Sequence, residues 1–329
     1  MSRPGVSHVR SLIEWHSSLP PAEAKFGIAC TFLSIIAFKT LDNALKNVTP
    51  PEALMSKGPE EIWRWRNMVV SWVHALLVGT WDILCFYYYP NLMNELVDHV
   101  VPFTYYMVAI STGYFLFDFW DMWIQKKTLK MWELTLHHFA VLSAFIYNII
   151  TVKYIAYTVV ALLAEVNSVF LHTRKLMQMH KVPFTNSAYR FNAVLNLLTF
   201  AGCRGYALFR ITYGMYMEPY RMSPFYFALL CASMLIMNLL NPILFCILLR
   251  NDFLRSTTST KLTKKGKNAP SSSADLTHNP TSHVPTLEGL GFAGPLVGDG
   301  FAGETRFRPM NGELNRDSSD LILSELDFT

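Results

Sequence analysis

Long apolar runs fill the first three quarters of this chain and constrain its fold more than any other feature. A helix needs about 20 mostly apolar residues to cross the hydrocarbon core of a bilayer. Seven runs of this kind cover residues 22–41, 67–89, 101–124, 134–152, 154–172, 191–217 and 224–249. Only 16% of the 329 residues are charged, against about a quarter in soluble proteins. We therefore predict an all-α, polytopic integral membrane helix bundle of about seven spans.

The sequence outside the runs divides the chain into three parts. A short segment, 1–21, precedes a transmembrane domain of residues 22–253, and residues 254–329 mix Ser, Thr, Pro, Gly and Lys without sustained periodicity. Such a composition predicts a disordered tail. The first run is the weakest, because it is continuously apolar only from Phe26 to Phe38 and could be a signal peptide. No small-residue cleavage site follows closely, so we predict a retained span.

Basic residues alternate between the loops. Loops 42–66, 125–133 and 173–190 and the segment after residue 249 each carry several Lys or Arg, whereas loop 90–100 carries neither. Cytosolic loops are enriched in these residues, so we predict an outside N-terminus and a cytosolic C-terminus. Asn47 begins a glycosylation sequon in a loop assigned to the cytosol, and we expect it to carry no glycan. This distribution gives no support to nucleic-acid binding.

The cysteines and the adjacent histidines predict no metal site. His137 and His138 point about 100° apart on a helix and lack the i,i+3 or i,i+4 spacing of paired zinc ligands. The cysteines all lie within apolar runs, without CxxC or Cys/His spacing, so we expect small hydrophobic residues and no disulfide framework. They are Cys30, Cys85, Cys203, Cys231 and Cys246.

Ionisable side chains inside the runs are the clearest sign of function, because they are costly in lipid and usually face a cavity or a partner. At 1.5 Å per residue, Asp118, His137, His138 and Glu165 all lie within about 10 Å of the inner ends of their spans. We expect Glu165 to pair with these histidines or with Arg204. The alternative is that such groups only hold the helices together. The predicted lining of a polar cavity is Asp118, Asp121, His137, His138, Glu165, Asn196, Arg204 and Asn241.

Several of these residues belong to longer motifs. The segment Trp132-Glu133-x-x-x-His137-His138, preceded by Gly113-Tyr114-Phe115-x-x-Asp118, resembles the TLC domain. That membrane fold is shared by ceramide synthases, a translocon-associated protein and a ceroid-lipofuscinosis protein, and the resemblance covers roughly residues 60–253. It is strongest to the subfamily of TLC domain-containing proteins one and two. The further matches are Glu165-Val166-Asn167, Phe170-Leu171, Arg174 and Leu249-Arg250-Asn251-Asp252-Phe253.

The resemblance implies a role in membrane lipid composition. The subfamily is associated with the plasma membrane and with limiting the incorporation of polyunsaturated, fluidising acyl chains into phospholipids. Ceramide synthases carry a second motif, His-Asp-x-x-Asp, where this chain has Ala164, Glu165 and Ser168. Acid–base chemistry needs a titratable group within hydrogen-bond reach of the reacting proton. The missing histidine therefore argues against conventional ceramide synthesis.

Three functional hypotheses stay open, all with membrane phospholipids or acyl chains as partners. The first is a regulator of phospholipid acyl composition and fluidity that needs no cofactor and is non-enzymatic or only weakly catalytic. The second is an acyl-CoA-dependent acyltransferase with His137 or His138 as base and Glu165 or Asp118 as orienting group. The third is a carrier or scaffold whose cavity only holds an acyl chain. The expected location is the plasma membrane, with the endoplasmic reticulum as the alternative.

Two short features of the tail predict cytosolic contacts. The basic stretch Lys261–Lys267 lies beside the last span. Attraction to anionic lipids at the membrane surface contributes about 1 kcal/mol of binding free energy per basic residue. Near the end, residues 317–322 have the form of an acidic dileucine sorting signal. The signal predicts binding of an adaptor at Asp317, Leu321 and Ile322.

Overall fold

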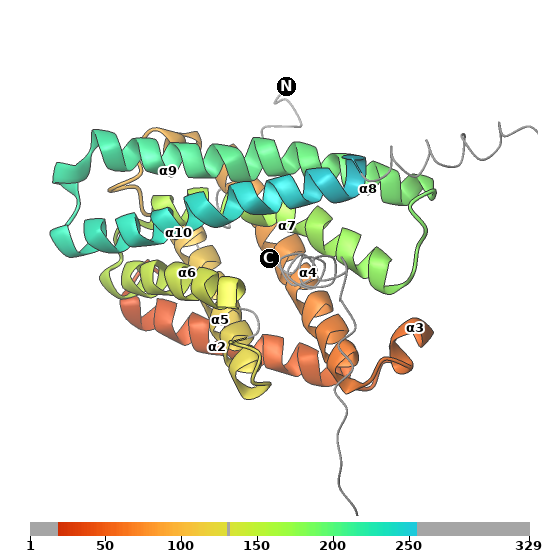
Figure 1. The fold of residues 1–329 in the computed structure, drawn as a ribbon. Helices are drawn as coiled ribbons and strands as arrows, with labels where there is room; N and C mark the ends of the chain where they lie inside the picture. The colour runs from red at the N-terminus through yellow and green to blue at the C-terminus, as the bar shows by residue number, and fades with distance from the viewer. Residues whose placement is uncertain (1–18, 130–131, 255–329) are drawn as a thin grey trace, which may run out of the picture.

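A computed structural model describes residues 19–129 and 132–254, and the regular elements within them are all helical (Figure 1). The α-helices are α2 (Ala24–Leu45), α3 (Glu52–Met55), α4 (Pro59–Tyr88), α5 (Pro102–Ile124), α6 (Trp132–Thr151), α7 (Ile155–Met179), α8 (Ser187–Thr199), α9 (Tyr206–Met217) and α10 (Pro224–Leu249). Short 3₁₀-helices are η1 (Pro90–Met93) and η3 (Pro219–Arg221), and π-helices are η2 (Phe200–Gly205) and η4 (Arg250–Leu254). The basic stretch and the sorting signal of the tail lie outside the described residues.

The predicted all-α membrane fold is confirmed. Within residues 19–129 and 132–254, five helices are long and apolar enough to cross a membrane: Ala24–Leu45, Pro59–Tyr88, Leu134–Thr151, Ile155–Met179 and Pro224–Asp252. The other two predicted spans are helical as well. The prediction for 101–124 corresponds to α5, and that for 191–217 falls within α8, η2 and α9, which follow one another without a break. We call these three elements together the α8–α9 rod.

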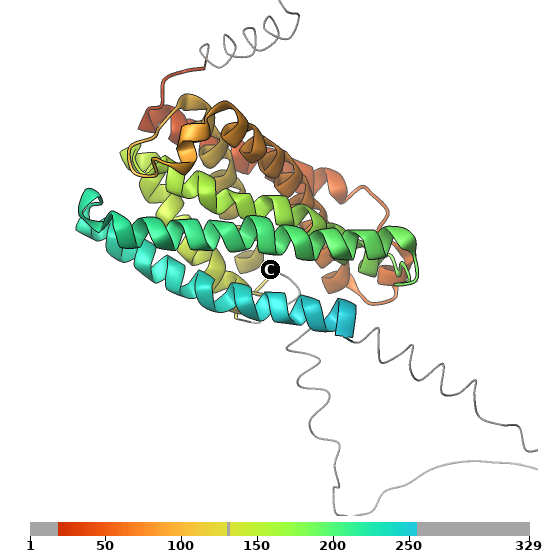
Figure 2. The same cartoon turned by 90° about the horizontal axis from the view of Figure 1, so that it is seen from above.

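The helices pack around α7, which is the most buried of the five apolar helices. α4 packs along α7 on one side, and the α8–α9 rod packs along it on another. α2 packs on α5, and α6 packs on α10. Figure 2 shows the rod and α10 running beside each other along one side of the bundle. Helices far apart in sequence thus surround a common interior.

Small residues allow two of these helix pairs to approach closely, as is usual between membrane helices. A Cβ added at Gly113 of α5 would lie 2.5 Å from both the Ser34 Cβ and the Thr31 backbone oxygen of α2. At the α4–α7 contact, a Cβ at Gly79 would lie 3.1 Å from the backbone nitrogen of Val166. The close approach lets the Ser34 hydroxyl donate to a backbone carbonyl of α5 at 2.7 Å.

The outer surface of the bundle is strongly apolar, and polar groups lie inside. Leu33, Phe209 and Leu235 are each more than 60% exposed, whereas Asn148 and Asn167 are fully buried. This distribution suits hydrocarbon surroundings, where polar groups must find partners within the protein. It agrees with a multi-pass membrane protein.

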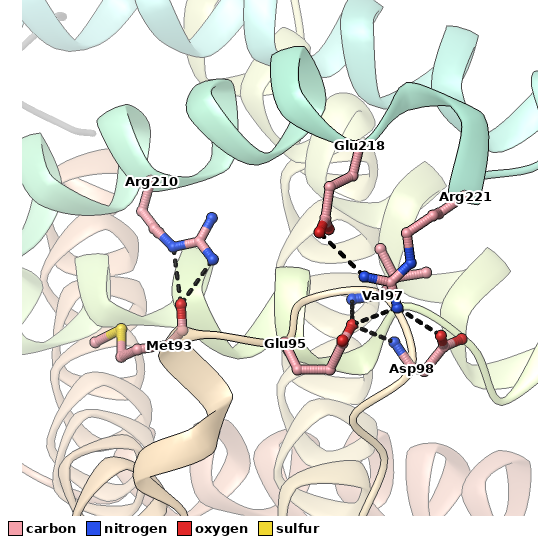
Figure 3. Close-up of polar contacts among 7 residues, drawn as sticks. All are labelled: Met93, Glu95, Val97, Asp98, Arg210, Glu218 and Arg221. Carbon is pink, nitrogen blue, oxygen red and sulfur yellow. Dashed lines mark hydrogen bonds and ion pairs between the residues drawn. The ribbon is translucent and has the colours of Figure 1, made fainter.

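Charged residues close one end of the bundle. Arg221, between the rod and α10, binds Glu95 at 2.9 Å, Asp98 at 2.7 Å and Glu218 at 3.0 Å (Figure 3). The hydrogen bonds that Arg221 donates to Asp98 and Glu95 raise the pKa of its guanidinium. Partial burial alone would raise the pKa of Glu95, but its bonds to Arg221 and to two backbone N–H groups leave that pKa below its ordinary value. We call these four residues the Arg221 cluster.

A second arginine ties the same loop to the rod. Arg210 of α9 donates from Nε and Nη2 to the carbonyl oxygen of Met93, at 2.9 and 2.6 Å (Figure 3). The loop between α4 and α5 is therefore held twice, once through its backbone and once through the Arg221 cluster.

Candidate functional site

A cavity of about 1070 Å³, measured with its opening, lies inside the bundle. It is bounded by α4, α5, α6, α7, α10 and the second half of the α8–α9 rod. Its walls combine apolar side chains such as Val141, Phe145 and Leu162 with many polar ones. The polar members are Asn67, Ser71, Tyr114, Asp118, His137, His138, Glu165, Ser168, His172, Arg204 and Asn241.

The structure brings six of the eight predicted lining residues to this cavity. They are Asp118, His137, His138, Glu165, Arg204 and Asn241. They come from five separate elements: α5, α6, α7, η2 and α10. The three positions of the second ceramide-synthase motif, Ala164, Glu165 and Ser168, also line it.

Asp121 and Asn196, the other two predicted lining residues, lie elsewhere. Asp121 does share a helix face with Asp118, but that face meets α4, where the Trp63 indole N–H donates to its carboxylate at 2.6 Å. Asn196 lies against α7, where its side-chain oxygen accepts from Asn167 at 2.9 Å. Both side chains satisfy contacts between helices, which is the structural role that polar residues often have in membrane bundles.

Asp118 and His138 form the closer of the two carboxylate–imidazole pairs at the cavity. The ring atom Nε2 of His138 lies 2.8 Å from Oδ2 of Asp118, and both side chains are buried. Nδ1 of the same ring lies 2.8 Å from the carbonyl oxygen of Leu134, one turn back on α6. The second carboxylate oxygen accepts from the amide of Asn67 at 2.5 Å.

These contacts determine how many protons the pair holds. A carbonyl oxygen can only accept, so Nδ1 of His138 carries hydrogen and donates to Leu134. Nε2 then faces a carboxyl group across a hydrogen-bond distance, which requires one more proton between them. The donor Asn67 on the other oxygen favours the carboxylate form of Asp118. The arrangement is thus a neutral pair that holds one transferable proton.

Glu165 has a different neighbour from the one expected. Its carboxylate lies 3.5 Å from Nδ1 of His74, a fully buried histidine of α4. The separation allows an ion pair but is too long for a good hydrogen bond. The His74 ring stacks on Tyr114, with centroids 3.8 Å apart and planes at 13°. α4 can bring this ring to Glu165 because Gly79 keeps α4 and α7 close together.

Arg204 lies on the rod side of the cavity, in the π-helical turn η2. Its Nη1 donates to the side-chain oxygen of Asn241 and its Nη2 to the hydroxyl of Ser168, both at 3.1 Å. The guanidinium also lies 5.2 Å from the centre of the Phe200 ring. All of these partners are neutral.

Sequence reasoning missed the contribution of α4. Asn67, Ser71 and His74 supply two cavity-lining groups and the partner of Glu165. Their spacing, i, i+4 and i+7, places them on one face of the helix. A polar stripe on an otherwise apolar helix is the signal that would have found them.

The remaining ionisable residues of the runs have varied surroundings. His172 lines the cavity, while Arg210 binds a loop carbonyl at the end of the bundle. Asp82 is fully buried on α4, and neither of its carboxylate oxygens has a hydrogen-bond partner among the described residues. Within residues 19–129 and 132–254, no three His, Cys, Asp or Glu side chains are grouped closely enough to hold a metal ion.

Fold and site together define a class: multi-pass membrane helix bundles with a cavity that joins apolar walls to acid–base groups. Residues 64–250 match the TLC domain. The chain is 33% identical to TLC domain-containing protein 2 of Danio rerio, over 72% of this chain and 95% of the relative. It is 31% identical to TLC domain-containing protein 1 of Gallus gallus, over 68% of this chain and 87% of that protein. The chain therefore belongs to the TLC domain family of membrane-associated, lipid-related proteins, as the sequence motifs predicted.

Proposed function

We propose that this protein holds lipid acyl chains in its cavity and thereby regulates phospholipid acyl composition, limiting the incorporation of polyunsaturated chains and lowering membrane fluidity. The observation that carries the proposal is the cavity itself. Its lining joins apolar side chains to several charged and polar ones, which is the combination found in ligand-binding cavities. Apolar walls such as Phe145 and Leu162 suit a hydrocarbon chain, and the polar end suits a head group.

The residues that α7 contributes to the cavity wall agree better with a regulator than with a ceramide synthase. Ala164 offers no titratable group, and the Ser168 hydroxyl accepts a hydrogen bond from Arg204. Glu165 alone keeps a carboxylate at the position of the second motif. Two of the groups on which the family's acyl transfer depends are therefore absent from this wall.

One observation favours acyl-CoA-dependent acyl transfer as a second candidate. A second imidazole, that of His137, lines the cavity beside the pair of Asp118 and His138, and an imidazole is the usual general base. In such an enzyme the His137 imidazole would accept the proton of the attacking hydroxyl or amine, because both ring nitrogens of His138 are engaged by Leu134 and Asp118. General acid–base catalysis contributes about 10²–10⁴-fold to a rate, so removing the imidazole would abolish measurable turnover.

A pair of variants separates the two candidates. Replacing both His137 and His138 with Gln keeps bulk and hydrogen bonding but removes the titratable base. Ala161→Phe instead fills the cavity, which Ala161 lines, and Leu198→Phe adds bulk to a residue that is 64% exposed as the matched control. The readouts are a fluidity-sensitive dye and the phospholipid acyl profile in cells that overexpress each variant.

The regulator is expected to lose its effect on fluidity with Ala161→Phe and to keep it with the double glutamine variant and with Leu198→Phe. Full loss in the double variant, with unchanged expression and location, would establish the acyltransferase instead. If cells that overexpress Ala161→Phe had the same phospholipid profile as cells that overexpress the wild-type protein, the cavity would play no part and the proposal would be wrong.

The plasma membrane is the proposed location. Surface biotinylation of the tagged chain tests it, since a protein of the endoplasmic reticulum would stay unlabelled in intact cells. The proposed sorting signal is tested by replacing Leu321 and Ile322 with Ala, which should raise the labelled fraction if an adaptor removes the protein from the surface.

A further inference from the structure

Arg204 is a buried cation whose recorded hydrogen-bond partners are neutral. The residue is 8% exposed, and its two hydrogen bonds go to a hydroxyl and an amide oxygen. Its Nε has no hydrogen-bond partner among the described residues. A guanidinium keeps its charge in proteins. Placing that charge within a membrane helix costs about 2.5–3.5 kcal/mol on membrane-insertion scales, which give the lowest values for this cost. A buried cation of this kind calls for an anion.

The described part of the chain does not place that anion beside it. No Asp or Glu carboxylate oxygen of residues 19–129 and 132–254 is recorded within 4.0 Å of the Arg204 guanidinium. The two carboxylates that line the cavity are engaged elsewhere, Asp118 with His138 at 2.8 Å and Glu165 with His74 at 3.5 Å. Arg204 therefore has Glu165 as an acidic neighbour in the cavity but no carboxylate in direct contact with its guanidinium.

The guanidinium has donors to spare. It carries five N–H groups in a planar fork, and the bonds to Ser168 and Asn241 use two of them. The fork matches a carboxylate or a phosphate, which can accept two parallel hydrogen bonds. Apolar side chains, among them Leu208 and Met237, line the same cavity. The site thus combines a cation with room for a hydrocarbon chain.

We propose that Arg204 binds the carboxylate of a free long-chain fatty acid whose tail occupies the apolar part of the cavity. Arg204 lies within the predicted span 191–217, and its guanidinium is buried inside the bundle at the depth of Ser168. A single-chain carboxylic acid can reach that depth in its neutral, protonated form and ionise beside Arg204. A phospholipid head group keeps its charge and its two chains, and it stays at the interface. The inference deepens the proposed function, on which it rests, by naming the ligand.

The head group provides the selectivity. An acyl chain that moves from the bilayer into the cavity leaves one apolar medium for another, so the hydrophobic effect favours neither. A hydrogen-bonded charge pair contributes about 1.5–3 kcal/mol, which corresponds to roughly 10- to 150-fold in affinity. A fatty acid is therefore expected to bind at least about tenfold more tightly than the alcohol of the same chain length.

Competition binding tests the proposal on the purified full chain in nanodiscs. Radiolabelled oleate is displaced by unlabelled oleate, oleyl alcohol or 1-oleoyl lysophosphatidic acid, which share one chain and differ in head group. The wild-type protein should prefer oleate over the alcohol by about tenfold or more, and over the lysophospholipid. Arg204→Gln should lose the preference for oleate, and Arg204→Lys should keep part of it, because it keeps the charge but not the fork. Phe209→Leu, an apolar change on the exposed surface of the same rod, is the matched control.

Two results would overturn the inference. Equal displacement by oleate and oleyl alcohol would show that the cation does not select the ligand, and this arm needs no variant to fold. Tighter binding of the lysophospholipid would assign the site to a phosphate. The assay is separate from the cellular test: a carboxylate preference that is lost with Arg204→Gln supports the ligand assignment even if Ala161→Phe leaves membrane fluidity unchanged.

Discussion

Arg174 and Asp252 face each other edge to edge, with Nε and Nη2 of the guanidinium each 2.8 Å from a different carboxylate oxygen. Their side chains are only 3% and 4% exposed. Arg174 lies near the end of α7, and Asp252 lies in η4, just beyond α10. The pair therefore fixes the end of the last long helix to the central helix. The two motif segments that contain Arg174 and Asp252 are separate in the sequence but contact each other in the fold.

Breaking this pair is expected to destabilise the protein severely. Asp252→Ala leaves the Arg174 charge buried without its counterion, which typically costs about 3–5 kcal/mol. We expect a large fall in the thermal unfolding temperature of the purified protein in detergent. Arg174→Met with Asp252→Leu removes both charges together and should recover most of the loss. A double variant no more stable than Asp252→Ala would show that the charges act separately.

The Arg221 cluster is expected to loosen in acid. Because the pKa of Glu95 is lower in the folded protein than its ordinary value, its contribution is complete above that ordinary value. The contribution is lost as the pH falls through the lowered pKa and the carboxylate is protonated. Hydrogen exchange of residues 94–101, corrected for its intrinsic pH dependence, should show loss of protection below about pH 4.

Glu95→Gln provides the control for this pH dependence. Its neutral side chain keeps hydrogen-bonding capacity but cannot titrate, so the loop should be less protected at neutral pH and respond less to acid. Equal pH profiles for the two proteins would contradict a role for Glu95.

The close approach of α2 and α5 predicts a strong effect of one methyl group. In Gly113→Ala the new Cβ meets both a backbone oxygen and a Cβ of α2 at 2.5 Å, so the helices must separate. Overpacking of this kind costs about 1–3 kcal/mol. Gly202→Ala is the comparison, because its added Cβ has no atom within 4 Å beyond the neighbouring backbone of its own helix, and the change should stabilise by up to about 1 kcal/mol. Chemical denaturation in mixed micelles measures both, and equal effects would contradict the packing account.

The proton of the Asp118–His138 pair can be observed directly. In Asp118→Asn the new amide can still accept from Asn67 and donate to Nε2 of His138, so the fold should be retained. His138 then needs only one proton, on Nδ1, where it donates to Leu134. Nitrogen-15 spectra of histidine-labelled protein should show two protonated ring nitrogens in the wild type and one in the variant. Identical spectra would mean that the pair is held together in another way.

Orientation in the membrane stays a prediction from the loop charges. A C-terminal tag should be reached by antibody only after permeabilisation, and Asn47 should carry no glycan. A mobility shift on glycosidase treatment that disappears in Asn47→Gln would reverse the predicted orientation or make the first run a cleaved signal.

The helices were predictable from the sequence because a bilayer demands long apolar runs, but their ends were not. The predicted span 67–89 begins eight residues after Pro59, where α4 starts. In that extra part Arg64 pairs with Glu60 and Glu61 at 2.9 and 3.1 Å. A hydropathy profile does not detect the part of a helix that extends beyond the apolar run and is stabilised by such ion pairs.

The partners of the cavity residues were harder to predict than the residues themselves. Charge in an apolar run pointed to Asp118, Glu165 and Arg204, whereas finding His74 beside Glu165 requires knowing how α4 and α7 cross. That crossing depends on the close contact at Gly79, which no hydropathy pattern contains.

The π-helical turn of the α8–α9 rod makes the site sensitive to residue count. A π-turn accommodates an additional residue, and one residue corresponds to about 100° of rotation about an α-helix axis. Arg204 reaches the cavity from within this turn. Deleting a single residue between Phe200 and Gly205 would restore regular helix and turn the guanidinium away from the cavity, towards hydrocarbon. We therefore expect this helix to tolerate exchanges of one apolar residue for another far better than a change in its length.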